Sequence, residues 1–377
     1  MRIAIVVPGG VDASGEDRVI HAFVWLIERL ASRHDVKVFA LYQDPEPGEW
    51  DLRGARVENI GTRPFRRLRF LFRFAAAHRE VPFDVVHAFF GGAGALASVA
   101  ARRHRVPLML HLAGGEPVGI HAIGYGSRLS LRGRIGLRVA IAGARRVTVA
   151  THFMRTLVAE RGIAAEVVPL GVALDRWPVH EPRPRDMGAP ARLLHIGDLR
   201  PVKAQGVLLD VAARLVRAGL DVQLDIAGLD TMSGALQRSA AAAELGDRVR
   251  FHGLLRRNAL RDLVVGSDLL LHTSLHEAGP LCVLEAAVAG VPTVGTNVGQ
   301  VSDWAPDAAV AAPVGDIDAL SQEVASLLSD EPRRLRLARE AQARATRYDA
   351  DFTAAEFERI YRELHAGRRK SSAAGRR

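Results

Sequence analysis

The sequence predicts an α/β protein built from two Rossmann-like domains, each with a doubly wound parallel sheet. The 377 residues are enough for two hydrophobic cores. Short runs of β-branched residues alternate with helical patterns along the whole chain. One stretch, 177–191, breaks this alternation with four prolines and mixed charges. Ligands bind outside the carboxyl ends of parallel strands, so two such domains are expected to face a cleft.

In the first half, the opening apolar run 2–7 leads into Pro8-Gly9-Gly10, which is typical of a strand that ends in a glycine-rich turn. Periodicity separates the remaining strands from the helices between them. Strands are expected at 2–7, 35–41, 84–90, 107–112, 146–150 and 166–170, and helices at 17–32, 64–79, 95–104, 128–142 and 152–161.

The same alternation restarts after the proline-rich stretch. Strands are expected at 192–196, 222–227, 249–251, 269–273, 293–295 and 310–312, and helices at 203–218, 256–266, 280–289 and 317–328. The predicted organisation is a first domain 1–175, a linker 176–191, a second domain 192–345, a C-terminal helix 346–366 and a basic, disordered tail 367–377.

Composition limits the class of protein. The chain has 51 basic and 42 acidic residues, and residues 1–175 carry 24 basic against 16 acidic side chains, so the positive charge lies in the first half. The single cysteine, Cys282, cannot form an intrachain disulfide, which favours a reducing compartment. No stretch resembles a secretory signal or a transmembrane helix. We expect a cytoplasmic protein, either soluble or peripheral on the inner face of the membrane.

The segment from Arg63 to Arg79 has six arginines interleaved with apolar side chains, four of which are phenylalanines. A helix here has one apolar side and one basic side, which suits anionic membrane headgroups. Packing of the apolar side on the core explains the pattern equally well. Nucleic acid is ranked last because no recognised nucleic-acid module accompanies the charge.

The densest cluster of candidate functional residues is 273–294, TSLHEAGPLCVLEAAVAGVPTV. Two carboxylates, Glu277 and Glu285, lie on either side of Gly279-Pro280. Proline suits a first helical turn, so Glu277 is expected in the loop and Glu285 on the second turn of the helix. The N–H groups of a helix N-terminus attract anions, and a carboxylate can accept hydrogen bonds from sugar hydroxyls. A solvated glutamate is the ordinary interpretation of Glu285 alone.

This cluster resembles the donor-binding segment of retaining GT-B glycosyltransferases, group 1 and family 4-like, which are marked by two glutamates separated by seven residues. The usual form reads S-x-x-E-G-F-G-L-x-x-L-E-A-x-A-x-G-x-P-V, and this sequence departs from it at Ala278 and in the order Gly279-Pro280. The matching positions are Ser274, Glu277, Gly279, Leu281, Leu284, Glu285, Ala286, Ala289, Gly290 and Pro292. The resemblance extends over most of residues 1–365.

The resemblance implies roles for residues of the second half. Glu277 would contact the transferred sugar and Glu285 the ribose, while Gly279, Pro280 and Leu281 would lie against the donor. The segment HIGDLRPVKAQGVLL supplies Lys203 for the diphosphate. The family's usual arginine is replaced by Asp198, and Arg200 is a candidate substitute. The backbone near Leu254 is expected against the nucleobase.

In the first half, Gly10 belongs to a loop that could approach the diphosphate, because the family has a glycine loop at this place. His111 ends a predicted strand and resembles the family's histidine at the cleft, which implies a hydrogen bond to the donor sugar. A packed histidine is the ordinary alternative. Glu116 is a candidate on the acceptor side.

The resemblance implies transfer of a sugar from a nucleotide-sugar donor, whose base stays unknown, to a saccharide or lipid-linked acceptor hydroxyl with retention. Glu277, His111 and Lys203 would act in catalysis. No cofactor and no metal are expected, because protein cations and helix dipoles can carry the diphosphate charge. The D-x-D pairs that begin at Asp316 and Asp349 lie by late helices, and capping explains the first pair.

Three alternatives stay open. A sugar-nucleotide epimerase of GT-B architecture would use the donor without an acceptor. A nicotinamide-dependent oxidoreductase would rest on the G-x-G-x-x-A match at residues 92–97, with Glu116 as the ribose acid, although close helix packing explains these small residues too. A non-catalytic saccharide or membrane scaffold would tolerate the loss of Lys203 and Glu277.

Overall fold

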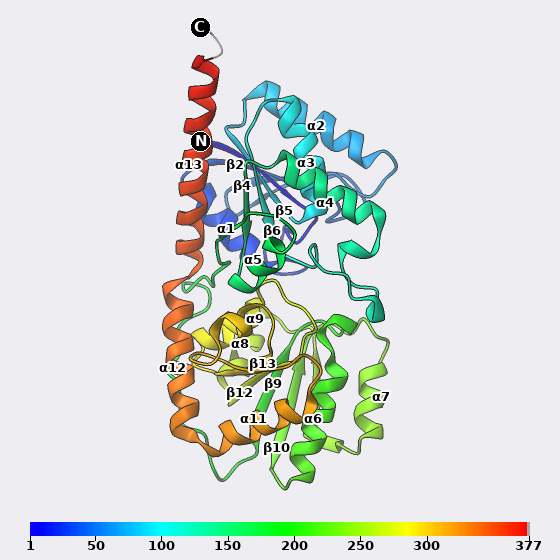
Figure 1. Ribbon diagram of the computed structural model, residues 1–377, viewed down its shortest axis with the longest axis vertical. Coiled ribbons are helices and arrows are strands. Elements are labelled where there is room, and N and C mark those ends of the chain that lie inside the picture. Colours follow the sequence, from blue (N-terminus) through cyan, green and yellow to red (C-terminus); the bar gives the residue numbers. More distant parts are fainter. Residues whose placement is uncertain (375–377) are drawn as a thin grey trace. The chain divides into compact units, whose positions relative to one another are not determined.

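The computed structural model describes the backbone of residues 1–374 and the side chains of residues 1–368. The chain forms two compact units (Figure 1). Unit 1 consists of Met1–Leu170 together with the chain from Ala350 onward, and unit 2 is Gly171–Asp349. Each unit is an α/β domain with a largely parallel sheet, which confirms the fold class expected from the sequence.

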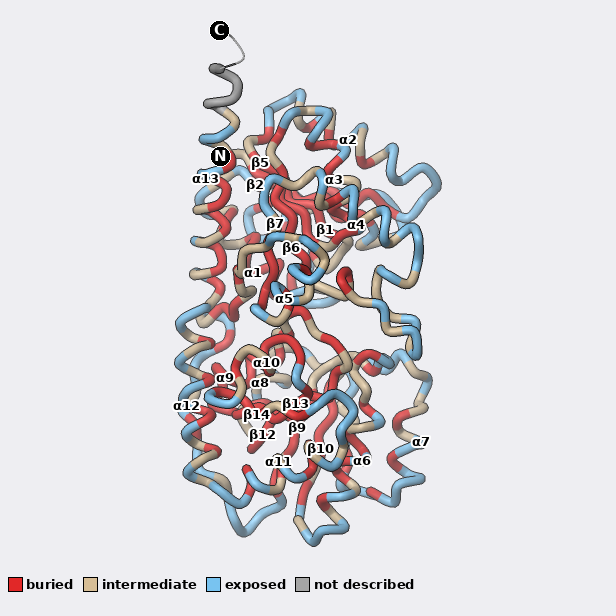
Figure 2. The backbone as a smooth tube through the Cα atoms, in the orientation of Figure 1, coloured by how far each residue is buried: buried red, intermediate tan, exposed pale blue. Residues whose placement is uncertain are grey.

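Unit 1 contains an eight-stranded sheet in the order β3-β4-β2-β1-β5-β6-β7-β8. All pairs are parallel except the hairpin of β3 and β4, which lies at one edge. The strands are β1 (Arg2–Val7), β2 (Asp35–Ala40), β3 (Gly48–Leu52), β4 (Ala55–Asn59), β5 (Val85–Phe89), β6 (Leu108–Leu112), β7 (Arg146–Val149) and β8 (Glu166–Val167). The central strands are almost entirely buried (Figure 2).

The helices of unit 1 are α1 (His21–Ala31), α2 (Arg66–Glu80), α3 (Gly91–Arg103), α4 (Leu131–Gly143), α5 (His152–Ala159) and α13 (Ala350–Ala374). The helix α13 packs beside α1, and its buried residues Phe357, Ile360 and Tyr361 belong to the same core as Ile3 and Val38. The core of unit 1 is therefore completed by a segment that lies 180 residues further along the chain than Leu170.

Unit 2 contains a six-stranded, all-parallel sheet in the order β11-β10-β9-β12-β13-β14. The strands are β9 (Ala191–Ile196), β10 (Val222–Ala227), β11 (Val249–Gly253), β12 (Leu269–His272), β13 (Thr293–Thr296) and β14 (Val310–Ala312). The helices are α6 (Gln205–Arg217), α7 (Ala235–Ala242), α8 (Arg257–Val265), α9 (Leu281–Val288), α10 (Gly299–Trp304), α11 (Ile317–Ser329) and α12 (Glu331–Arg347). Leucine and valine from the strands, α6 and α11 form one core.

The boundaries differ from the predicted ones in three places. Unit 2 begins at Gly171 and includes the stretch expected as a linker, because Trp177 is fully buried in it. The expected C-terminal helix 346–366 is replaced by two helices, α12 in unit 2 and α13 in unit 1. Helix α13 continues through Ala374, so the expected disorder of the tail 367–377 is wrong up to that residue, and 375–377 lie outside the described residues.

No helix within residues 1–374 is long and apolar enough to cross a membrane.

The G-x-G-x-x-A match at residues 92–97 lies inside α3, and a Cβ on Gly94 would lie only 2.5 Å from Leu110 Cδ1. Close packing against Leu110 and Ala140 therefore explains the glycine at this position. Asp316 caps α11 by accepting from the N–H of Ala319 at 2.9 Å, as capping predicted.

Candidate functional site

The site in unit 2 lies where the order of its strands reverses. The chain goes from β9 to β10 and β11 on one side and then to β12 on the other, so β9 and β12 are neighbours with loops that leave in opposite directions. Such a switch point is where doubly wound sheets bind ligands. Residues 197–203 follow β9 and residues 273–280 follow β12, so both segments singled out in the sequence meet at this point.

An ion pair joins the two loops. Lys203 Nζ lies 2.6 Å from Glu277 Oε1, and Ser274 Oγ donates to the same oxygen at 2.7 Å. The loops are also tied through the backbone, because Thr273 Oγ1 donates to the carbonyl of Lys203 at 2.9 Å and Leu275 N donates to that of Val202 at 2.8 Å. The lysine and the first glutamate of the motif are thus held together by contacts within unit 2.

The charge of Glu277 is fixed by its surroundings. Burial raises the pKa of this carboxyl, but the cation of Lys203 and the hydrogen bonds from Lys203 and Ser274 outweigh it and bring the pKa to about 2. His272 lies 3.6 Å from the same oxygen, and burial lowers its pKa to about 4, so its ring is neutral at neutral pH. Glu277 is therefore an ionised acceptor at neutral pH and not a proton donor.

The backbone leaves little space around Glu277. Gly299, which begins α10, has φ +53°, and a Cβ there would lie 2.9 Å from Glu277 Cβ and 3.0 Å from Pro280 Cδ. Only glycine combines this conformation with this close approach. The start of α10 therefore fixes the loop that carries the first glutamate.

Glu285 lies on the second turn of α9, as expected, but it is buried and not solvated. Burial raises its pKa, and Arg257, whose guanidinium donates to Oε1 at 2.9 Å, opposes that shift. The same guanidinium lies 4.6 Å from the ring centre of Trp177, whose indole N–H donates to the Glu285 carbonyl at 2.9 Å. Glu285 is thus held by a cation and by an aromatic ring from two other segments of unit 2.

The other residues expected in the donor site lie in three places: at the start of α9, after β11 and after β9. Pro280 is the N-cap of α9 rather than its first residue, so Leu281 begins the helix and Gly279 precedes the cap. Leu254 follows β11 and is two-thirds exposed. Arg200 is exposed and lies 3.3 Å from Asp198, so part of its charge is compensated by the acid that replaces the family's arginine.

In unit 1, the glycine loop Pro8-Gly9-Gly10 lies at the corresponding switch point between β1 and β5. Gly10 has φ +82° and its N–H is engaged by Gln43 Oε1 at 2.6 Å. A cavity of about 420 Å³ adjoins this loop, lined by Pro8, Gly9, Gly10, Arg18, Val19, Ile20, Tyr42, Gln43 and Phe90. Unit 1 therefore has a concave site with two aromatic side chains at the carboxyl edge of its sheet.

His111 and Glu116 do not line this cavity. His111 has no exposed surface, its Nδ1 lies 2.9 Å from Thr148 Oγ1, and its ring packs on Phe89 and Phe357. Burial lowers its pKa to about 3. Glu116 is buried and accepts from the N–H groups of Gly91 and Gly114 at 3.1 and 2.8 Å. The structure favours the packed interpretation of His111, and Glu116 holds the start of α3.

Sequence reasoning missed Arg257, Trp177, His272 and Gly299. Arg257 and Trp177 lie far from Glu285 in the chain, and no spacing connects them to it. His272 is the last residue of β12, just before the cluster. A polar side chain at the carboxyl end of a parallel strand is a candidate site residue, and this position could have identified His272 from the sequence.

Two family models match the chain. One described as "Glycosyl transferases group 1" matches residues 183–344, and one described as "Glycosyl transferase 4-like domain" matches residues 19–199. Together they extend from residue 19 to residue 344. The first includes the loops of Lys203 and Glu277, and the second includes most of unit 1.

Similar curated proteins are glycosyltransferases. A D-inositol 3-phosphate glycosyltransferase of Geodermatophilus obscurus is 29% identical over 332 residues, covering 78% of this chain and 72% of that enzyme. A glycogen synthase of Mycobacterium tuberculosis is 30% identical over 207 residues, covering 54% of this chain and 50% of that enzyme. This chain thus spans about half of the latter's length.

Solved structures share the fold. A sucrose-phosphate synthase from Thermosynechococcus elongatus superposes with a TM-score of 0.83 at 16% identity, covering 97% of this chain and all of that one. HepE of Anabaena, solved with UDP and glucose, gives a TM-score of 0.76 at 18% identity, covering 96% and 100%. Since both family models and the similar curated proteins are glycosyltransferases, the chain belongs to the glycosyltransferases, with a group 1 domain at residues 183–344 and a 4-like domain at residues 19–199.

Proposed function

We propose that this glycosyltransferase moves a sugar from a nucleotide-sugar donor to an acceptor hydroxyl with retention at the anomeric carbon. The observation that carries the proposal is the ion pair between Lys203 and Glu277 at the switch point of unit 2, with α9 beginning directly beside it. The site combines a cation, a helix N-terminus and an ionised carboxylate, which suit a diphosphate and the hydroxyls of a sugar.

In this proposal, Lys203 and the first N–H groups of α9 stabilise the negative charge that develops on the departing diphosphate. Glu277 stays ionised and accepts hydrogen bonds from the transferred sugar, so its role is to position the sugar. Glu285 accepts from the ribose hydroxyls, since a carboxylate can accept several hydrogen bonds and Arg257 engages its Oε1. Gly279, Pro280 and the backbone near Leu254 complete the donor site, and no protein nucleophile is assigned.

The test of donor binding is saturation-transfer NMR of the protein with UDP-, GDP- and ADP-sugars. One nucleotide sugar should bind, and Lys203→Ala should abolish its signal. Glu285→Ala should weaken binding by about 1–3 kcal/mol, the scale of a lost hydrogen bond to a charged group. A folded Glu285→Ala variant with unchanged affinity would exclude the ribose role, and binding of NADH alone would favour an oxidoreductase.

Product analysis separates transfer from the alternatives. With the donor identified, NMR of the product should show the anomeric configuration of the donor. Inversion would contradict retention. Release of an epimerised sugar nucleotide or free sugar without acceptor would favour the epimerase. Full biological function in Lys203→Ala would favour a scaffold.

We propose that the reaction needs no metal and no cofactor; the proposal is supported by the cation of Lys203 beside Glu277 and by the N-terminus of α9, since a cation and a helix N-terminus can carry the charge of a diphosphate. Initial rates measured in excess EDTA should equal those measured with added Mg²⁺ or Mn²⁺. A rate that falls in EDTA and returns with one of these cations would contradict this proposal.

We propose that the cavity beside the glycine loop receives the acceptor, a saccharide or a lipid-linked glycan. Tyr42 and Phe90 offer faces on which a sugar ring can stack, and Arg18, held by Asp12 and Asp44, adds a positively charged side chain. Tyr42→Ala should raise the KM for the acceptor and leave the KM for the donor unchanged. An equal rise in both constants would argue against an acceptor site here.

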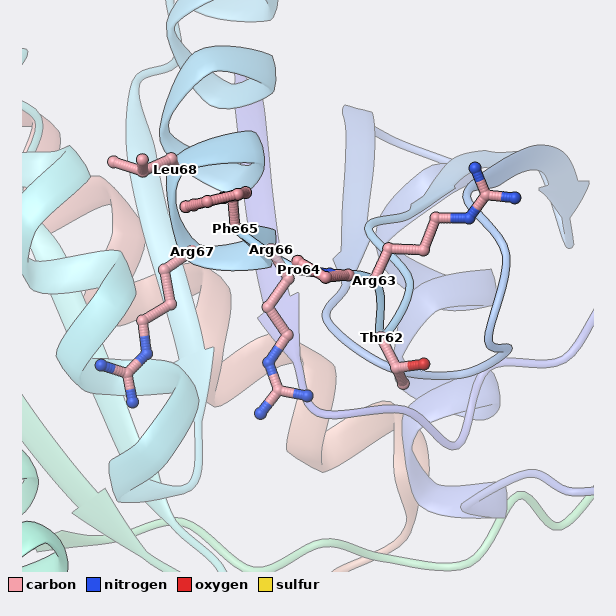
Figure 3. A pocket seen from close by; sticks show the side chains of 7 residues that line it. All are labelled: Thr62, Arg63, Pro64, Phe65, Arg66, Arg67 and Leu68. Carbon is pink, nitrogen blue, oxygen red and sulfur yellow. The ribbon is translucent and has the colours of Figure 1, made fainter.

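The start of α2 supports a further proposal, that unit 1 attaches to an anionic membrane surface as a peripheral protein. Phe65 is 80% exposed at φ +62°, a conformation that phenylalanine rarely adopts, and Phe72 is 71% exposed. In Figure 3, Arg66 and Arg67 extend in one direction from the start of this helix. Exposed aromatic side chains beside arginine suit the interface between headgroups and acyl chains.

Co-sedimentation with phosphatidylglycerol vesicles tests this attachment. Phe65→Ser/Phe72→Ser and Arg66→Gln/Arg67→Gln should each reduce the bound fraction. Arg336→Gln/Arg339→Gln, which removes the same charge from the exposed face of α12, should not. Equal binding by all variants would leave core packing as the sole role of α2.

A further inference from the structure

A second large cavity in unit 1 lies at the opposite edge of the sheet from the glycine loop. Its volume is about 1240 Å³. It adjoins the amino ends of β6 and β7, where Leu108 and Arg146 begin these strands. The glycine loop follows the carboxyl end of β1, so this cavity is separate from the acceptor site proposed above. Its lining comes from the ends of α3 and α4 and from α13.

The lining is strongly basic. Five arginines and one histidine contribute to it, against a single carboxylate, Glu363. The cationic side chains are Arg102, Arg105, Arg145, Arg146 and Arg368, with His104 beside them. Apolar residues of the lining, such as Val106, Leu108 and Leu364, are buried. We name this feature the arginine cavity.

Contacts within unit 1 occupy only some of these arginines. Arg102 donates to the carbonyl of Ala142, and Arg368 donates to that of Phe83 at 3.0 Å. Arg146 lies 3.8 Å from Glu363, which also accepts from Arg359 at 2.8 Å. Attraction to the carbonyl groups at the C-terminal end of a helix accounts for Arg102. The same attraction does not explain the positions of two further arginines, one that follows the end of α3 and one that follows the end of α4.

Those two are Arg105 and Arg145. Both are exposed, and neither side chain makes a hydrogen bond or ion pair with the residues that the structure describes. Arg105 has φ +54°, a conformation uncommon for a residue other than glycine. Guanidinium groups bind phosphate through two parallel N–H donors. A concave surface with several of them and buried apolar residues matches a small phosphorylated molecule.

We propose that the arginine cavity binds a soluble anion with two or more phosphate groups, at a site distinct from the donor and acceptor sites. Five arginines line this cavity and Glu363 is the single carboxylate of its lining, so a ligand with one negative charge would balance only a small part of the positive charge. Arg105 and Arg145, the exposed arginines of the lining, bind the phosphates directly.

The test is calorimetric titration of the whole protein with inorganic tripolyphosphate at about 150 mM salt, where diffuse attraction is screened. Saturable binding is expected. Arg105→Gln/Arg145→Gln should weaken it by about tenfold or more, the scale of lost hydrogen bonds to a charged group. Arg56→Gln/Arg155→Gln removes the same charge from other exposed positions of unit 1 and should change it by less than about twofold.

Three results would overturn the proposal. The first is the absence of saturable binding in the wild type. The second is equal weakening by the control pair, which would indicate a diffuse positive field. The third is loss of binding in Lys203→Ala with normal binding in Arg105→Gln/Arg145→Gln, which would place the tripolyphosphate in the donor site.

A lipid headgroup offers the same phosphate chemistry, and vesicles distinguish it. Phosphatidylglycerol vesicles should bind wild type and Arg105→Gln/Arg145→Gln equally, because the proposed ligand is soluble. If the variant loses vesicle binding and keeps tripolyphosphate binding, the proposal is wrong and the cavity binds lipid.

Discussion

At the scale of single residues, the ion pair of Lys203 and Glu277 links function to stability. The carboxylate is largely buried, and the side chain of Lys203 is one-fifth exposed. Removing one partner of such a pair leaves a charge in a site that solvates it poorly. If the diphosphate of a bound donor draws Lys203 away from Glu277, the buried carboxylate needs other hydrogen-bond donors in place of the lysine. Hydroxyls of the transferred sugar could supply these donors, which agrees with the positioning role proposed for Glu277.

The pair predicts a pH dependence of stability. The pKa of Glu277 falls from 4.5 to about 2 on folding, so its contribution is present above pH 4.5 and is lost as the pH falls toward 2. The full shift corresponds to about 3 kcal/mol. In Lys203→Met, burial dominates and the pKa rises. The difference in unfolding free energy between wild type and variant should therefore be large at pH 7 and smaller at about pH 3.

Urea unfolding at the two pH values measures this difference. Glu277→Gln is the matched control, because it removes the titrating group and keeps its shape. Wild type should lose more stability than Glu277→Gln between neutral and acidic pH. The same loss in both proteins would show that Glu277 is not ionised and stabilised in the way described.

At the scale of elements, the junction of α10 with the Glu277 loop carries the next prediction. Gly299→Ala places a methyl group 2.9 Å from Glu277 Cβ at φ +53°. We expect a loss of about 1–3 kcal/mol of stability, the cost of a strained backbone position. Donor affinity should fall as well, because the loop must move. Gly206→Ala in α6, where a Cβ would meet nothing within 4 Å, is the control. Normal donor binding in a folded Gly299→Ala would contradict the fixed-loop argument.

Helix α2 has apolar side chains on two faces, and they should respond differently to truncation. Phe70 and Phe74 are fully buried against Phe39, whereas Phe72 is exposed. Phe70→Ala should cost about 3–5 kcal/mol of unfolding free energy, and Phe72→Ala about 0.5 kcal/mol or less. Thermal or urea unfolding of the two variants measures this contrast. Similar losses would mean that Phe72 also packs in the core.

These elements show what sequence alone could predict. Periodicity located nearly all the parallel strands, because buried strands of parallel sheets are short apolar runs. It missed the hairpin β3–β4, which is polar on one side, and it missed the short helices α7 and α10. Motif spacing found Lys203 and both glutamates because they lie in two continuous segments of the sequence, 195–209 and 273–294. Arg257 and Trp177 reach Glu285 only through the tertiary fold, and no local pattern records such contacts.

At the scale of the whole molecule, the chain leaves unit 1 at Leu170, completes unit 2 and returns to unit 1 at Ala350. The returning helix α13 buries Phe357, Ile360 and Tyr361 in the unit 1 core. The Tyr361 hydroxyl lies 2.6 Å from His87 Nδ1, and Arg29 pairs with Asp351 at 2.8 Å. Unit 2 is continuous in the chain, whereas unit 1 is not. The two units should therefore differ in their ability to fold as fragments.

We predict that fragment 171–349 unfolds cooperatively in urea, because its core is formed entirely by its own residues. Fragment 1–170 should lack a cooperative transition and bind hydrophobic dye, since the surface that α13 covers becomes exposed. A peptide of residues 350–368 added to it should restore the transition, and the same peptide with Phe357→Ser and Tyr361→Ser should not. Cooperative unfolding of 1–170 alone, or rescue by both peptides, would show that α13 is peripheral to the core of unit 1.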